Sequence, residues 1–292
     1  MTSPAVTSSI PLLLFHGLLS SPQEFGLMAH SLRSHGIVHH AVTIPGYTLA
    51  NDIASPDWHD WQRSAHLAVD DACPGDGPVI LGGLCMGGML AAATALSSTR
   101  KIAGLVLMSP TFQYDGWGMS PIRHLRHLAY WIGIDRFFSV NEREPFGVKN
   151  EKIRRWVKEQ MQERAVSAVG PARMSLRALR QAEKMMAHVR RQLAVLDCPL
   201  LVIHAREDEI TSLGSVQRVF DSLPVADKTL AVLENSYHMI TIDNDRRQVT
   251  QLLDQFVHRV TEQHTITRPA VTSVPIRLPA RRFAPRLNVV SI

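Results

Sequence analysis

The chain has 292 residues, of which 45% are hydrophobic and 20% are charged, and this composition excludes a disordered or collagen-like protein. Its three cysteines form no C-x-x-C pair, so we expect neither a disulfide scaffold nor a zinc site. No apolar run reaches the roughly 18 residues needed to cross a membrane, and no basic segment precedes an apolar one at the N-terminus. We therefore expect a cytoplasmic protein.

The formal net charge of +5 comes from one end of the chain. Residues 264–292 contain five arginines, four prolines and no acidic residue, whereas residues 1–263 are electrically neutral. Because the prolines prevent a regular helix, we expect an irregular basic tail over 264–292. The charge therefore does not indicate a nucleic-acid-binding domain.

Short apolar runs alternate with longer amphipathic segments in chain order, which is typical of an α/β fold with a mostly parallel sheet flanked by helices. The expected strands are Pro11–Phe15, His40–Ile44, Pro78–Gly82, Ala103–Met108, Pro199–His204 and Thr229–Leu233. The expected helices are Glu24–His35, Trp58–Ala72, Met86–Ser97, Val216–Ser222 and Arg246–Thr261.

The alternation is interrupted in the middle of the chain, where no strand is predicted between Pro110 and Asp197. Helical patterns appear near Pro121–Ile132, Glu151–Gln162 and Ala172–Leu196. Such an insertion predicts a helical cap over the carboxyl ends of the strands, where open α/β sheets bind ligands. We therefore expect a core formed by residues 1–110 and 198–263 and a cap formed by residues 111–197.

The strongest functional signal is the sequence Gly83-Leu84-Cys85-Met86-Gly87-Gly88, which lies between a predicted strand and a predicted helix. It is the nucleophile-elbow pattern G-x-S-x-G with cysteine in place of serine. Gly83 and Gly87 avoid side-chain clashes in the sharp turn, and the helix N-terminus favours a Cys85 thiolate. The alternative is a glycine-rich turn that holds a structural cysteine.

A second loop, Phe15-His16-Gly17-Leu18-Leu19, ends the first predicted strand. In hydrolases with a nucleophile elbow, an N–H from such a loop and the N–H after the nucleophile form the oxyanion hole. These donors are expected to be the backbone amides of Leu18 and Met86. His16 is expected to be structural, because it lies behind the loop.

An acid and a histidine follow two later strands. Asp208 comes just after a strand end and is the expected triad acid, with Glu207 and Glu209 as alternatives. His238 follows the last predicted strand. The order nucleophile, acid, histidine matches α/β-hydrolases and differs from chymotrypsin and subtilisin.

These motifs together resemble the α/β-hydrolase superfamily from about Pro11 to Val260, and most closely its bacterial carboxylesterase and monoacylglycerol-lipase branch. The segments that carry the resemblance are Leu13–Leu18, Ile44–Tyr47, Trp58–Trp61, the elbow Gly83–Gly88, His204–Asp208 and Ser236–Ile240. The main departure is Cys85, where that branch normally has serine.

A Cys85–His238–Asp208 triad predicts acyl chemistry through a thioester acyl-enzyme, with no metal or organic cofactor. The expected substrate is an ester or thioester, and water or a second acceptor would receive the acyl group. An acyl carrier protein or acyl-CoA is a candidate donor. The alternative is a non-catalytic ligand-binding module on the same scaffold.

The predicted cap is rich in large apolar side chains, which favour a pocket for an apolar acyl chain. The residues concerned are Met108, Met119, Leu125, Leu128, Tyr130, Trp131, Phe137, Phe138, Trp156, Met161, Met174, Met185 and Met186.

Overall fold

A computed structural model describes residues 9–48, 57–120, 124–164, 166–167 and 170–266 of the chain. Its centre is a six-stranded sheet with the strand order β10-β9-β4-β3-β1-β2, in which every pair is parallel. The strands are β1 (Leu12–Phe15), β2 (His39–Ala41), β3 (Val79–Leu84), β4 (Ile102–Met108), β9 (Leu200–Ala205) and β10 (Lys228–Leu233). The central strands are buried on both faces, as their continuous apolar sequences require.

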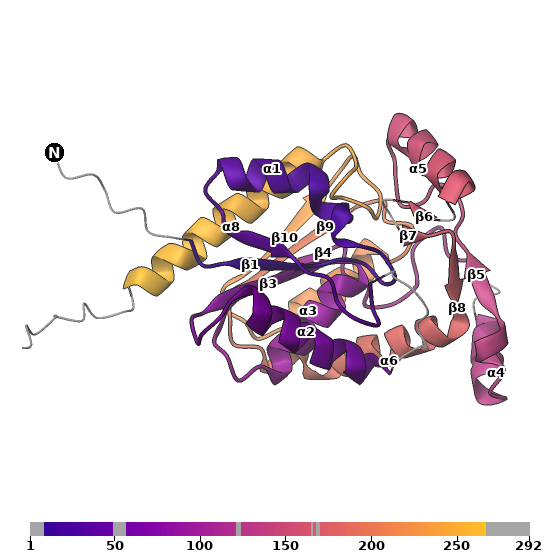
Figure 1. Cartoon of the computed structure of the whole chain (residues 1–292), viewed down its shortest axis with the longest axis horizontal. Helices are drawn as coiled ribbons and strands as arrows, with labels where there is room; N and C mark the ends of the chain where they lie inside the picture. The colour runs from indigo at the N-terminus through magenta and orange to yellow at the C-terminus, as the bar shows by residue number, and fades with distance from the viewer. Residues whose placement is uncertain (1–8, 49–56, 121–123, 165, 168–169, 267–292) are drawn as a thin grey trace, which may run out of the picture.

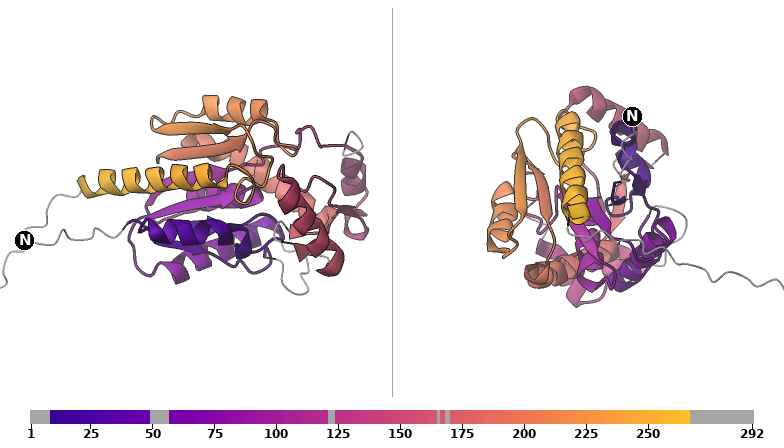
Figure 2. Two further views of the ribbon diagram at one scale, coloured as in Figure 1. Left: turned by 90° about the horizontal axis from the view of Figure 1, so that it is seen from above. Right: turned by 90° about the vertical axis from the view of Figure 1, so that its left-hand side faces the viewer.

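Helices cover both faces of the sheet (Figure 1). One hydrophobic cluster joins the sheet to α1 (Gly26–Ser34) and α8 (Arg246–Ile266). A second cluster joins the opposite face to α2 (Trp58–Ala72), α3 (Met86–Ser97) and α6 (Leu176–Gln192). The two further views in Figure 2 show the sheet between these layers. The predicted parallel sheet flanked by helices is therefore confirmed.

Several element boundaries differ from the sequence prediction, among them those of the second strand and the last helix. The second strand covers only His39–Ala41 instead of His40–Ile44, because the chain turns at 45–47 and Tyr47 N–H and Thr48 N–H both donate to Ile44 O. The last helix ends at Ile266 and not at Thr261. Residues 264–266 are therefore helical rather than part of an irregular tail, and residues 267–292 lie outside the described residues.

The segment between β4 and β9 is not free of strands, so that expectation was wrong. It contains two short antiparallel pairs, β5 (Ser139–Asn141) with β8 (Arg173–Ser175) and β6 (Val166–Ser167) with β7 (Gly170–Pro171). Strands of two or three residues are too short to show an alternating pattern in sequence. The helices of this segment are α4 (Arg126–Trp131), α5 (Glu151–Arg164) and α6, and residues 121–123 at the predicted start of the first one are outside the described residues.

Helix α6 packs against α2 and α3, in the helix layer on one face of the sheet. It begins at Leu176, capped by Ser175, whose side chain accepts a hydrogen bond from Ala178 N–H. Its buried Ala182 and Met185 belong to the same cluster as α2 and α3. The division into a core over 1–110 and 198–263 and a cap over 111–197 stays a prediction, with α6 in contact with the core helices. Among the described residues, no helix is long and apolar enough to span a membrane.

Candidate active site

Cys85 lies in the tight turn between β3 and α3, with φ 55° and ψ −123°. Two neighbouring glycines make this turn possible. A Cβ on Gly83 would lie 2.3 Å from the carbonyl group of Gly87, and a Cβ on Gly87 would lie 2.1 Å from Phe15 O. Any side chain at either position would overlap backbone atoms. The strained backbone at Cys85 is typical of a functional turn.

Asp208 and His238 form the second part of the site. Asp208 Oδ2 lies 2.7 Å from His238 Nδ1, and Asp208 Oδ1 accepts hydrogen bonds from the N–H groups of Ile210 (2.8 Å) and Thr211 (2.9 Å). Burial acts to raise the pKa of Asp208, but His238 and these hydrogen bonds outweigh it and hold the pKa below its usual value. Asp208 is therefore a fixed anion that orients the imidazole.

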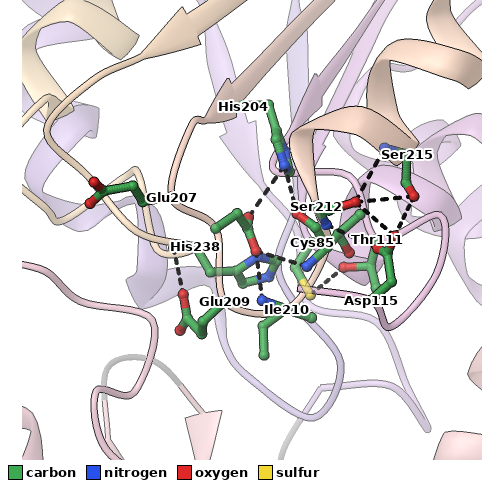
Figure 3. Close-up of polar contacts among 12 residues, drawn as sticks. Cys85, Thr111, Asp115, His204, Glu207, Glu209, Ile210, Ser212, Ser215 and His238 are labelled. Carbon is green, nitrogen blue, oxygen red and sulfur yellow. Dashed lines mark hydrogen bonds and ion pairs between the residues drawn. The ribbon is translucent and has the colours of Figure 1, made fainter. Parts of the chain in front are cut away.

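His238 is poised to accept a proton at its other ring nitrogen. Burial acts to lower its pKa, but the negative charge of Asp208 and the nearby Cys85 sulfur outweigh this and raise it well above the usual value. Nε2 is buried and has no hydrogen-bond partner among the described residues. The Cys85 sulfur instead lies 3.2 Å from Thr111 Oγ1 (Figure 3). The sulfur is also close enough to His238 to raise the pKa of the imidazole, so the two side chains are neighbours.

The two acidic neighbours of Asp208 do not contact the imidazole ring. Glu207 is exposed and pairs with Lys149 at 2.6 Å. Glu209 is buried and accepts a hydrogen bond from the backbone N–H of His238 at 3.2 Å. Burial raises the pKa of Glu209 to about 7. Of the three carboxylates that the sequence left open, Asp208 is the one bonded to the histidine ring.

The loop after β1 carries the backbone amides that the sequence singled out. Met86 N–H begins α3, next to Cys85, and Leu18 N–H lies in the loop. Among the described residues, neither amide has a hydrogen-bond acceptor in the protein. The preceding amide, Gly17 N–H, donates instead to Glu24 Oε2 at 2.8 Å. Gly17 N–H is therefore occupied, and Leu18 N–H is the free donor of this loop.

Glu24 is a residue of the candidate site that the sequence reasoning missed. It lies in the short 3₁₀ helix η1 (Pro22–Phe25) and is 1% exposed. A carbon placed on Gly17 would lie 3.2 Å from Glu24 Oε1 and 3.9 Å from Cys85 Cβ, so Gly17 separates this carboxyl group from the nucleophile turn. Burial raises the pKa of Glu24 to about 7, against the opposing influences of Gly17 and His238. Glu24 thus holds the loop through a carboxyl group that titrates near neutrality.

Replacing Glu24 with glutamine should stabilise the protein at pH 8 and leave its stability at pH 5 nearly unchanged. A group whose pKa is higher in the folded than in the unfolded state costs stability as the pH rises from its unfolded pKa, 4.5, to its folded pKa, about 7. A glutamine avoids this cost, which is on the order of 3 kcal/mol, and its amide oxygen can still accept from Gly17 N–H. Urea denaturation at both pH values measures the difference.

The matched control is Glu144→Gln. Glu144 is exposed, and its hydrogen bond with Lys158 lowers its pKa, so its removal should bring no gain at pH 8. A Glu24→Gln protein that is less stable than the wild type at pH 8 would contradict the assignment of a buried, costly charge.

The residues proposed for a methionine-rich acyl pocket do not all lie together in the structure. Met108, Met185 and Met186 are buried in the two core clusters. Trp131 and Phe137 are instead 83% and 70% exposed. The spacing of apolar residues along a helix shows that they share one face of the helix, but it does not show which part of the protein covers that face.

Other histidines have structural positions. His16 is buried, and its ring nitrogens lie 2.8 Å from Gly17 O and 2.7 Å from Thr48 Oγ1. Burial lowers the pKa of His16 to about 4, so it is neutral. His204 Nε2 lies 2.9 Å from Thr211 O and 3.7 Å from Asp208 Oδ2. Within the described part of the chain, no group of three or more His, Cys, Asp or Glu residues could hold a metal ion.

A parallel sheet with an elbow cysteine, a strand-end acid and a late histidine defines the α/β-hydrolase class. The chain matches the family model described as Serine aminopeptidase, S33, over residues 10–245. The protein therefore belongs to this family of α/β-hydrolase enzymes.

Individual relatives agree with this membership. The chain is 24% identical over 250 residues to a thermostable monoacylglycerol lipase of a Bacillus strain, covering 85% of this chain and 90% of the relative. It is 22% identical to a carboxylesterase of Bacillus subtilis, with coverage of 85% and 92%. The crystal structure of a Paleococcus ferrophilus monoacylglycerol lipase has the same fold, with a TM-score of 0.71, 18% identity and coverage of 86% and 94%.

Proposed function

We propose that the protein is a cysteine-dependent hydrolase of esters or thioesters that works through a thioester acyl-enzyme. The observation that carries this proposal is the Asp208–His238 bond of 2.7 Å beside a cysteine in a strained strand-to-helix turn. A ligand-binding module without turnover would not need an oriented, buried imidazole with a free Nε2.

The first half of the reaction forms the acyl-enzyme. His238 Nε2 takes the proton of the Cys85 thiol, and the thiolate attacks the substrate carbonyl carbon. The carbonyl oxygen becomes an oxyanion, which the free N–H groups of Leu18 and Met86 stabilise. The C–O or C–S bond to the leaving group breaks, and the proton on His238 passes to that group.

The second half returns the enzyme to its starting state. His238 Nε2 removes a proton from water, and the resulting hydroxide attacks the thioester carbonyl. The C–S bond breaks, the carboxylic acid leaves, and Cys85 recovers its proton from His238. Asp208 remains ionised throughout because its pKa is held low. An alcohol, amine or thiol in place of water would turn the same intermediate into acyl transfer.

The substrate class is proposed from the relatives. The similar Bacillus proteins are described as a monoacylglycerol lipase and a carboxylesterase. Both names indicate carboxylic ester substrates, and the first indicates an apolar acyl chain. We therefore propose an ester with an apolar acyl group as the first substrate to test, and an acyl thioester as the second.

Exposure to p-nitrophenyl butyrate should add one butyryl group to the protein, and peptide mapping should place it on Cys85. Neutral hydroxylamine should remove it, because hydroxylamine cleaves thioesters readily. The measurement is intact-protein mass spectrometry within the first turnover, followed by digestion.

Cys73 and Cys198 provide internal controls in the same sample. Both thiols are buried, and burial raises the pKa of each, to about 12 in the case of Cys198. Cys85 is only half-buried. An adduct on Cys73 or Cys198 ahead of Cys85 would refute the proposed intermediate.

A further inference from the structure

Seven large apolar side chains are exposed within sixteen consecutive residues of the chain, on and after α4. We call this surface the α4–β5 face. It consists of Leu125, Leu128, Trp131, Ile132, Phe137, Phe138 and Val140, each between 48% and 83% exposed. A contiguous exposed apolar surface of this kind marks an interaction site.

Helix α4 has its apolar face outward and its polar attachments inward. Leu125, Leu128 and Ile132 recur at helical spacing and are all exposed. On the inward side, Arg126 pairs with Glu183 at 2.5 Å, and both side chains are largely buried. The helix is thus fixed to α6 by a buried ion pair, while its hydrophobic stripe has no partner among the described residues.

The charges around this face have one predominant sign. Four exposed arginines lie within the same segment or beside it: Arg136, Arg143, Arg173 and Arg177. Within residues 124–144, the structure describes three acids. Asp135 is buried and pairs with Arg180, Glu144 is exposed and pairs with Lys158, and Glu142 is exposed. The face therefore combines aromatic and aliphatic side chains with a net positive charge.

The α4–β5 face adjoins the candidate active site. The chain that follows β5 reaches the catalytic histidine, because Gly147 O accepts a hydrogen bond of 2.8 Å from the N–H of Met239, the residue after His238. Figures 1 and 2 show α4 and β5 at one end of the molecule, far from the C-terminal end of α8. A partner bound to this face would therefore lie next to the catalytic site.

We propose that the α4–β5 face docks on the surface of an anionic phospholipid membrane. Exposed Trp and Phe beside Arg are the side chains that enter the headgroup boundary of a bilayer, and the arginines are attracted by anionic lipids. A second copy of the chain is a poorer occupant, because a two-fold contact would bring the same arginines together. The proposal does not depend on Cys85 being the nucleophile.

The test is binding of the full-length protein to vesicles of phosphatidylcholine with about one third phosphatidylglycerol, compared with phosphatidylcholine alone. The Trp131→Ser/Phe137→Ser variant should bind the mixed vesicles at least about 10-fold more weakly than the wild type. The matched control is Leu67→Ser/Val195→Ser, which removes two apolar side chains of similar exposure (65% and 69%) elsewhere, and should bind like the wild type. Turnover of a short, water-soluble ester should be unchanged in both variants.

A second readout separates docking of this face from attraction of the basic residues 264–292, which all three proteins share. Brominated lipid chains should quench Trp131 in the wild type, and the Trp131→Phe variant should keep its binding and lose that quenching. Equal loss of binding in the control pair, no quenching of Trp131, or a lipid-free dimer abolished by Trp131→Ser/Phe137→Ser would each overturn the proposal. The last outcome would identify a second copy as the occupant.

Discussion

Replacing Cys85 with alanine should lower kcat for ester hydrolysis by at least about 10⁴-fold and abolish the acyl adduct. The reason is that the residues around Cys85 supply no second nucleophile in its position: Thr111 Oγ1 lies 3.2 Å from the sulfur, but no base contacts it in the described structure. His238→Ala should be nearly as severe, and Asp208→Asn less so, because a thiolate depends less on the third member than a serine would. Steady-state kinetics with p-nitrophenyl butyrate measure all three.

The matched control for this prediction is Thr111→Val, which keeps the size of the side chain and removes only its hydrogen bond to the sulfur. If that contact is a resting position of the thiol, kcat should change by less than about 10-fold. Thermal unfolding should confirm that Cys85→Ala is folded. A folded Cys85→Ala enzyme with more than a tenth of the wild-type kcat would exclude the triad mechanism.

Cys85→Ser distinguishes the two fates of the acyl group. A serine oxyester is less readily transferred to thiols and amines than a thioester is, so the substitution should increase the fraction of acyl groups lost to water if the natural reaction is transfer. If the natural reaction is hydrolysis, the product distribution should not change. Product analysis in the presence of added glycerol and a thiol reads this fraction directly.

The sequence was sufficient to predict the sheet and to propose the triad residues, because both depend on local patterns. A buried parallel strand is a short apolar run, and the turn at Cys85 needs glycines at two fixed positions, Gly83 and Gly87. Asp208 and His238 each follow a strand end, and the parallel topology brings the carboxyl ends of those strands to one edge. The order of the strands in the sheet determines which strand-end side chains lie next to one another.

The contacts that the sequence could not predict are those that join distant or irregular segments. In the sequence, Glu24 resembles a solvated residue at the start of a helix. In the structure it is buried, and it accepts a hydrogen bond from Gly17 N–H in the loop after β1. The short strands β5 and β8 pair with each other, and the paired residues Val140 and Met174 are 34 residues apart in the sequence. Neither strand is long enough to show an alternating hydrophobic pattern. The outward apolar face of α4 was misinterpreted as a pocket wall because periodicity shows that a helix has two faces but not which one is covered.

Replacing Gly87 with alanine should destabilise the protein by more than about 4 kcal/mol, enough to remove most soluble folded protein. Its Cβ would lie 2.1 Å from Phe15 O and 2.4 Å from His16 O, and both atoms belong to backbone at the end of the central strand β1. Backbone in a packed sheet cannot move aside as the end of a flexible side chain can. The substitution should therefore disrupt the contact between α3 and β1, and this contact also positions the Cys85 turn against the Leu18 loop.

The control is Gly77→Ala, in the exposed loop before β3, where an added Cβ meets nothing within 4 Å. It should leave the free energy of unfolding within about 0.5 kcal/mol of the wild type. Urea denaturation followed by circular dichroism compares the two variants with the wild type, and soluble yield serves where Gly87→Ala cannot be purified. A Gly87→Ala protein that folds with near wild-type stability would show that β1 and the first turn of α3 are farther apart than in this structure. The oxyanion loop and the nucleophile turn would then not be held as the mechanism requires.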